Sequence, residues 1–129
     1  VFLAKIARLA LGYRGPIALM SFDPAVMAVL REKAPSVPRG IVSGTFAGHG
    51  WWNRALGRNR AHALRDLLES GAAEPDFYAY QVGALPTPVT RYVREVQGLP
   101  LFTWTVRSAK DRAAAAKWAD APIFEGFEP

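Results

Sequence analysis

Five short apolar runs alternate with amphipathic stretches along this chain, and this alternation constrains its fold more than any other feature. The runs are residues 17–22 (IALMSF), 40–44 (GIVSG), 77–82 (FYAYQV), 101–106 (LFTWTV) and 123–127 (IFEGF). Each run has the length of a buried strand, and each connection is long enough to hold a helix. The pattern therefore predicts an α/β fold in which about five parallel strands alternate with helices through right-handed crossovers.

Signals for helix starts lie between these runs. Asp23 and Thr87 are each followed by proline, which places an N-cap before a proline at the first helical position. Ser108 and Asp111 resemble a capping box. The expected helices cover residues 1–12, 24–34, 51–70, 88–97 and 109–119.

Two architectures satisfy this pattern. The chain has 129 residues, half of them hydrophobic, which is enough for one domain with a core. One possibility is a self-contained, doubly wound sheet of five strands. The other is a segment of a (β/α) barrel, whose complete form needs roughly 250 residues. Periodicity does not separate the two, but in both of them ligands bind at the carboxyl ends of the strands.

Composition excludes several classes of site. The chain has no cysteine, so it has no disulfide framework, thiolate metal site or thiol nucleophile. No apolar run approaches the roughly 20 residues that a membrane-spanning helix needs. The amphipathic start lacks a signal-peptide cleavage site. We therefore expect a cytoplasmic protein without a membrane span.

Basic residues are concentrated in one stretch. Sixteen lysines and arginines against eleven acidic residues give a net charge of +5. The densest stretch also lies close to two tryptophans, and its members are Arg54, Arg58, Arg60, His62 and Arg65, with Trp51 and Trp52 before them. A nucleic-acid surface needs a concentrated basic stripe beside stacking aromatics. Because the charges are not gathered into one block, we expect a solvated helix face and no nucleic-acid partner.

The predicted strand ends carry hydroxyls, an amide, aromatics and one carboxylate. No glycine-rich phosphate loop, HExxH pattern or EF-hand pattern occurs. Glu125 is the one carboxylate at these ends, too few for a metal cage, and we cannot assemble a Ser–His–carboxylate triad. His49 and His62 lie away from the strand ends. The residue chemistry indicates a binding surface without catalytic machinery.

Each candidate at a strand end also has a structural interpretation. Ser21 is placed as a helix-entry hydroxyl would be, bonding local backbone. Trp104 lies in an apolar strand, where an aromatic side chain usually belongs to the core. Glu125, inside an apolar run, must reach water, a cation or a basic partner, which leaves a site and a surface position equally open.

Several stretches of the chain resemble bacterial glycerophosphodiester phosphodiesterases. They follow one another in the same order as in the family and cover almost the whole chain: residues 20–24 (MSFDP), 34–40 (APSVPRG), 77–80 (FYAY) before a Leu-Pro pair, 99–107 (LPLFTWTVR) and 119–127 (ADAPIFEGF). The Trp-Thr-Val strand and the Phe-Glu-Gly near the end are the more specific of these matches.

The resemblance implies a TIM-type (β/α) barrel and favours the barrel segment over the self-contained sheet. The family's His-Arg-Gly opening, its Glu and Asp metal ligands, its second catalytic histidine and its Glu-Ile-Lys strand belong to its N-terminal half. None of these motifs occurs here. By resemblance, residues 1–129 are a single partial domain, the C-terminal portion of the barrel, with no catalytic or metal-binding residues of its own.

The resemblance also implies a function for the complete enzyme. This is metal-assisted hydrolysis of glycerophosphodiesters to an alcohol and sn-glycerol 3-phosphate with a divalent cation, Mg²⁺ or Ca²⁺, while the chain alone is inactive. The implied substrate-binding residues are Ser21, Phe22, Trp104 and Glu125. The expected partner is the N-terminal half of the barrel or a second copy of the chain. The rival hypothesis is a non-enzymatic α/β module that binds a ligand or self-associates.

Overall fold

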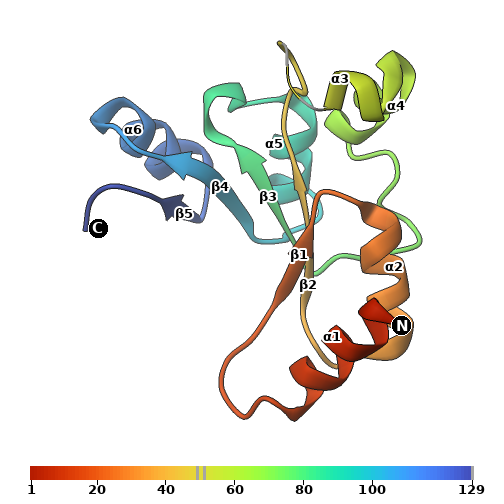
Figure 1. Ribbon diagram of the computed structural model, residues 1–129. Coiled ribbons are helices and arrows are strands. Elements are labelled where there is room, and N and C mark those ends of the chain that lie inside the picture. Colours follow the sequence, from red (N-terminus) through yellow and green to blue (C-terminus); the bar gives the residue numbers. More distant parts are fainter. Residues whose placement is uncertain (49, 51, 129) are drawn as a thin grey trace.

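The computed structural model describes residues 1–48, 50 and 52–128, and it shows one parallel sheet of five strands (Figure 1). The strands are β1 (Leu19–Ser21), β2 (Arg39–Ser43), β3 (Phe77–Gln81), β4 (Leu101–Val106) and β5 (Ala121–Phe124). Their order in the sheet is their order in the sequence, and every pair is parallel. A doubly wound sheet would reverse its order at a switch point. The sequential order is that of a barrel segment, as predicted.

The connections between strands are helical. The helices are α1 (Phe2–Gly12), α2 (Pro24–Lys33), α3 (Trp52–Ala55), α4 (Gly57–Arg65), the 3₁₀ turn η1 (Val82–Ala84), α5 (Pro88–Glu95) and α6 (Ala109–Trp118). The Asp23 carboxylate accepts a hydrogen bond from the amide of Ala25 at 3.0 Å. Thr87 and Ser108 both form capping boxes. The predicted helix starts at 24, 88 and 109 are therefore confirmed.

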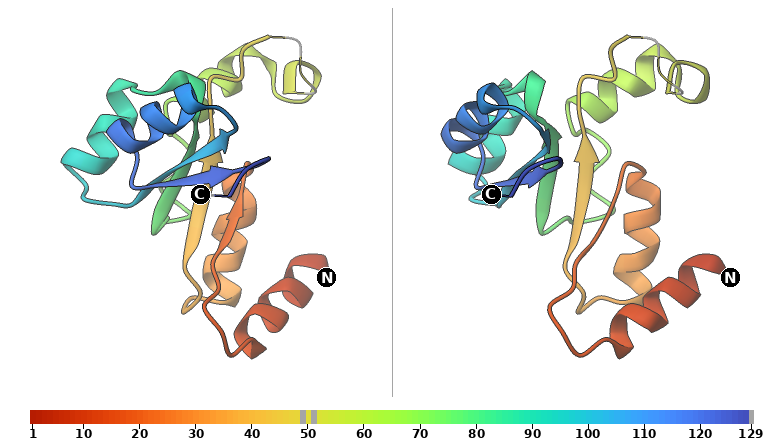
Figure 2. Two further views of the ribbon diagram at one scale, coloured as in Figure 1. Left: turned by 90° about the vertical axis from the view of Figure 1, so that its left-hand side faces the viewer. Right: turned by 60° about the vertical axis from the view of Figure 1, so that its left-hand side comes forward.

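The sheet turns strongly from its first strand to its last. In the left view of Figure 2, β1 and β2 stand nearly upright, whereas β4 and β5 lie across the picture. The pairing of β4 with β5 is irregular between Thr103 and Val106, and the peptide bond between Trp104 and Thr105 is cis. Twist accumulates between neighbouring parallel strands, and it gives this sheet the curvature of an incomplete barrel.

Two strands, β1 and β5, differ from their predicted bounds by two residues or more, whereas the others agree within one residue. β1 begins at Leu19 and not at residue 17. Leu19 pairs with Arg39 of β2, and the residue before Arg39 is Pro38. Because proline has no amide proton, it cannot donate a hydrogen bond that would extend this pairing. β5 covers Ala121–Phe124 where residues 123–127 were predicted. Gly126 has a φ of 84° and turns the chain out of the extended path. Glu125 therefore lies just beyond the strand.

The single helix predicted over residues 51–70 is wrong. The chain forms α3 and α4 instead. Gly57, the first residue of α4, has a φ of 69°, and this left-handed conformation breaks the helix between the two. Leu67, with a φ of 59°, keeps the helix from continuing after α4. Trp51 of the predicted helix and His49 before it lie outside the described residues.

The core lies between the sheet and the helices that cover it. Its fully buried members include Met27, Tyr80, Val93 and Leu101. Arg39 is also buried, and its guanidinium donates to the carbonyls of Ala73 at 2.7 Å and Glu74 at 3.1 Å. No helix among the described residues is both long enough and apolar enough to cross a membrane.

Candidate functional site

A pocket of about 270 Å³ opens where the carboxyl ends of the first four strands meet. Among the described residues its lining carries no charged side chain; the members are Phe22, Gly44, Thr45, Phe46, Ala47, Trp52, Gln81 and Trp104. This edge of a parallel sheet is where barrel proteins bind their ligands. The structure thus brings together Phe22 and Trp104, two of the four predicted substrate-binding residues.

Aromatic rings form the wall of this pocket. The ring of Phe22 meets that of Trp104 edge-on at a centroid distance of 5.4 Å, and that of Phe46 at 6.5 Å. Edge-to-face packing of this kind fixes the rings relative to one another and is worth about 1 kcal/mol per pair beyond area burial. The pocket therefore presents a rigid apolar wall to a ligand.

Trp104 is both a structural residue and a wall of the pocket. Its indole Nε1 lies within hydrogen-bonding distance of the carbonyls of Ser43, at 3.2 Å, and Ala79, at 3.1 Å. These carbonyls belong to β2 and β3, so the indole N–H is occupied inside the protein. Trp104 consequently offers a ligand its ring and not a hydrogen-bond donor.

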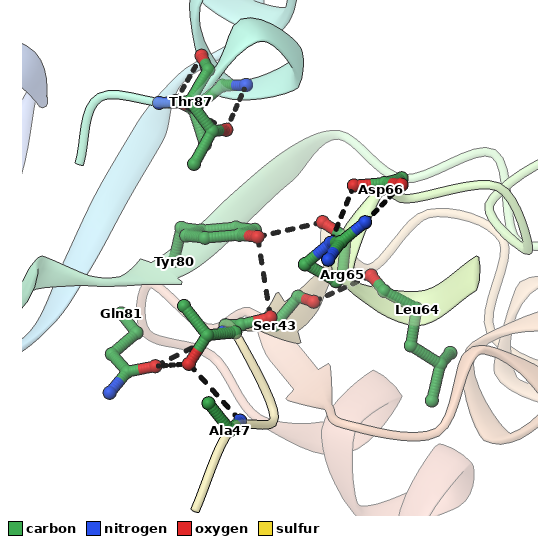
Figure 3. A network of polar contacts seen from close by, with 11 residues as sticks. Ser43, Ala47, Leu64, Arg65, Asp66, Tyr80, Gln81 and Thr87 are labelled. Carbon is green, nitrogen blue, oxygen red and sulfur yellow. Dashed lines mark hydrogen bonds and ion pairs between the residues drawn. The ribbon is translucent and has the colours of Figure 1, made fainter. Parts of the chain in front are cut away.

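A side chain at the end of β3, Gln81, holds the loop that follows β2 (Figure 3). The amide and hydroxyl of Thr45 both donate to Oε1 of Gln81 at 3.2 Å, and the Thr45 hydroxyl accepts from the amide of Ala47 at 3.3 Å. Between them, Phe46 has a φ of 51°, a conformation that costs a residue with a side chain about 1 kcal/mol or more. The Gln81 contacts hold the strained loop and so place the Phe46 ring against the pocket.

A second set of hydrogen bonds fixes the floor behind this loop (Figure 3). The Tyr80 hydroxyl lies 2.8 Å from the Arg65 carbonyl and 3.3 Å from that of Gly44, and the Ser43 hydroxyl donates to the carbonyl of Leu64 at 2.7 Å. Burial raises the pKa of Tyr80 to about 12, with the nearby Asp66 charge adding to the shift. Tyr80 therefore stays neutral near pH 7 and acts as a structural link between β3 and the end of α4.

The other two predicted site residues lie outside the pocket lining. The Ser21 hydroxyl accepts from the Asp23 amide at 3.0 Å, the helix-entry role that its position also suggested. The Glu125 carboxylate pairs with the Arg107 guanidinium, with a closest distance of 2.6 Å between oxygen and nitrogen, and both side chains are exposed. Their contacts with a substrate stay predictions.

Sequence reasoning did not place Thr45, Phe46 or Trp52 in a ligand pocket, and it considered Trp52 as an aromatic residue beside the basic stretch. They follow β2 in a loop and a short helix whose path depends on Gln81 and on the left-handed turn at Phe46. A glycine-containing loop after a strand was visible in the sequence, but nothing in it indicated which side chains turn inward.

The described residues do not fit the divalent cation that the resemblance implies. Among them, no group of three or more His, Cys, Asp or Glu side chains could hold a metal ion. The pocket itself is lined by amides, a hydroxyl and aromatics. Hard divalent cations take several oxygen ligands, usually with carboxylates among them. We therefore derive no step through a metal on this chain.

Comparison with known proteins supports the same architecture. No family model and no curated protein matches the sequence. Among solved structures, the chain is similar to the crystal structure of a "Putative glycerophosphoryl diester phosphodiesterase" from Silicibacter pomeroyi DSS-3, with a TM-score of 0.62 and 20% sequence identity. The match covers 95% of this chain and 41% of that one, so the chain spans about two fifths of its neighbour's length. By its sheet order and by this likeness, the chain has the α/β fold of a partial (β/α) barrel.

Proposed function

We propose that this chain is the C-terminal part of a barrel that hydrolyses glycerophosphodiesters to an alcohol and sn-glycerol 3-phosphate. The observation that carries the proposal is the aromatic pocket at the strand ends, in which Phe22 and Trp104 lie together. Both residues belong to stretches that resemble the phosphodiesterase family. The fold shared with the Silicibacter pomeroyi protein supports the same assignment.

In this proposal the pocket binds and orients the glycerol end of the substrate. The Phe22 and Trp104 rings pack against the carbon backbone of glycerol, while Gln81 and Thr45 supply polar groups near its hydroxyls. Hydrolysis adds water across a P–O bond, giving the phosphate its new oxygen and the leaving alcohol its proton. The acid–base groups and the divalent cation that this step needs belong, we propose, to the rest of the barrel.

The test is release of glycerol 3-phosphate from glycerophosphoethanolamine in Mg²⁺ or Ca²⁺. We expect no release by the 129-residue chain, with its mass verified. We expect release by a longer protein in which this sequence follows a segment carrying the His-Arg-Gly opening. Metal-dependent release by the short chain would contradict the assignment of the chemistry to the other part, and no release by the longer protein would contradict the function.

The second candidate is a self-associating module. It is favoured by the two open edges of the sheet, because within the described residues β1 pairs only with β2 and β5 only with β4. Unpaired backbone groups at an edge recruit another strand unless they are covered. The oligomeric state of the chain, considered in the Discussion, separates this candidate from a chain that folds as a monomer.

A further inference from the structure

A second cavity, of about 400 Å³, adjoins the aromatic pocket. The two share one wall, which consists of Thr45, Phe46, Ala47 and Trp52. The other side of the second cavity comes from α4, through Gly57, Arg58, Ala61, His62 and Arg65. In Figure 1, α3 and α4 lie beyond the ends of the strands, at the opposite end of the molecule from α1. A ligand seated in the aromatic pocket therefore has this second cavity next to it.

The second cavity is basic. Arg58, His62 and Arg65 follow one another at helical spacing, so all three lie along one side of α4. Arg65 makes two hydrogen bonds of 3.0 Å to the carboxylate of Asp66. Among the described residues no acidic side chain lines the cavity, and neither Arg58 nor His62 has an ion-pair partner. Because Arg65 is paired with Asp66 and His62 lies near the Asp66 charge, the unpaired positive charge of the cavity comes from the Arg58 guanidinium.

Another arginine of α4, Arg60, has carboxylates within reach. Arg60 lies 3.6 Å from Asp23 and 3.3 Å from Glu69. Its charge is compensated on the surface, whereas that of Arg58 faces an open cavity. A guanidinium fork matches the two oxygens of a carboxylate or a phosphate. The chemistry of the cavity thus favours an anionic ligand.

We propose that this cavity binds an anionic group carried by the leaving alcohol, so that the enzyme prefers glycerophosphodiesters whose alcohol carries a carboxylate or a further phosphate. This inference rests on the proposed function, because it takes the glycerol end to lie in the aromatic pocket. In this proposal the molecule spans the shared residues, with its glycerol end in the aromatic pocket and its alcohol in the second cavity. A nucleic acid fits less well, since it needs an extended basic stripe, and Arg54 of the same basic stretch lines neither cavity.

Binding tests the inference without any catalysis. Glycerophosphoserine and glycerophosphoethanolamine differ by one carboxylate, so their affinities for the chain are compared by calorimetric titration at low salt. We expect the serine compound to bind more tightly. Arg58→Gln combined with His62→Gln should remove most of that preference, which we expect to be about fivefold from the exposed Arg58 charge. The matched control is Arg8→Gln on α1, which removes a charge at the far end of the molecule and should keep the preference.

Equal affinity for the two compounds, or a preference that survives in the double variant, would overturn the anion site. Tighter binding of a short single-stranded oligonucleotide than of glycerophosphoserine, lost in the same double variant, would overturn it in favour of nucleic acid. In the longer protein, the ratio of kcat/KM for glycerophosphoserine to that for glycerophosphoethanolamine should fall in the double variant and stay the same in Arg8→Gln. A binding preference without any hydrolysis would count against the proposed function and leave the anion site standing.

Discussion

Gly44 lies where the pocket has no room for a side chain. A Cβ atom placed there would lie 2.7 Å from Oε1 of Gln81 and 2.9 Å from its Cβ. Gly44→Ala should displace Gln81 and release the Thr45 loop, at a cost of about 1–3 kcal/mol in unfolding free energy. Thermal denaturation measures the loss. Gly71→Ala is the control, because nothing lies within 4 Å of a Cβ there, and an equal loss in both variants would contradict this explanation.

Trp104→Phe separates the two roles of Trp104. Phenylalanine keeps an aromatic wall but lacks the N–H that the Ser43 and Ala79 carbonyls accept. We expect a loss of about 1 kcal/mol in stability and a fall in kcat/KM of the longer protein of up to about 100-fold, through misplacement of the substrate. Unchanged kinetics with a lowered Tm would make Trp104 a core residue alone.

At this scale the sequence predicted that Phe22 and Trp104 lie at the strand ends, but not that Phe46 and Trp52 join them, nor how the rings are held. The place of Trp104 near the end of an apolar strand was readable, and so was that of Phe22. The contact between Thr45 and Gln81 depends on the register of β2 against β3, in which Ser43 pairs with Tyr80. If one strand shifted its register by one residue, the Gln81 side chain would point to the other face of the sheet. No local sequence pattern could therefore predict the contact between Thr45 and Gln81.

Asp120, between α6 and β5, joins three elements. Its carboxylate accepts from the Leu101 amide at 2.7 Å and from Arg94 at 2.9 Å, which ties the start of β5 to β4 and α5. Burial alone would raise the pKa of Asp120, but these hydrogen bonds outweigh it and the pKa is lowered. The stabilisation from Asp120 is therefore present above the ordinary carboxyl pKa and is lost as the pH falls through the lower, folded-state value.

Asp120→Asn should consequently lower the free energy of unfolding by about 1 kcal/mol at pH 7, a modest amount because the side chain is partly exposed. The difference from the unchanged protein should become smaller as the pH approaches 3. Urea unfolding at a series of pH values measures the difference. Glu32→Gln removes an exposed carboxylate on α2 and serves as the control. A deficit of Asp120→Asn that stays constant down to pH 3 would show that the charge of Asp120 does not matter.

Among the elements, those whose ends carry a capping side chain were predicted best. Asp23, Thr87 and Ser108 each accept the hydrogen bond that their position suggested. The region after β2 was predicted worst, because its apolar residues gave a helical period across Gly57. The spacing of apolar residues predicts which of them face the core. It does not predict a residue with a left-handed backbone that changes the direction of the helix.

The whole sheet leaves apolar side chains at its edges exposed. Met20 on β1 is 49% exposed and Phe124 on β5 is 42% exposed. Because burying such surface is worth roughly 25 cal/mol per Å², we expect the purified chain to associate with itself when no other barrel segment is present. Light scattering should give a mass above that of the monomer.

Met20→Lys should reduce this association, since a charge on an edge strand opposes pairing with another strand. Tyr92→Lys is the control, because it places the same charge on an exposed position of α5, in the helical layer. A stable monomer that unfolds cooperatively would contradict the expectation and favour a self-contained sheet.

The strictly sequential order of the strands has a consequence for protein engineering. In the part of the chain that the structure describes, each strand pairs only with its neighbours along the chain, so completing a ring around this sheet requires new ladders at β1 and β5 alone. The two parts of such a ring can therefore be supplied as separate polypeptides fused to two proteins of interest. Under the proposed function, hydrolysis of a glycerophosphodiester would then report that those two proteins had met. Pairing at the sheet edges would set how strongly the two parts assemble without them.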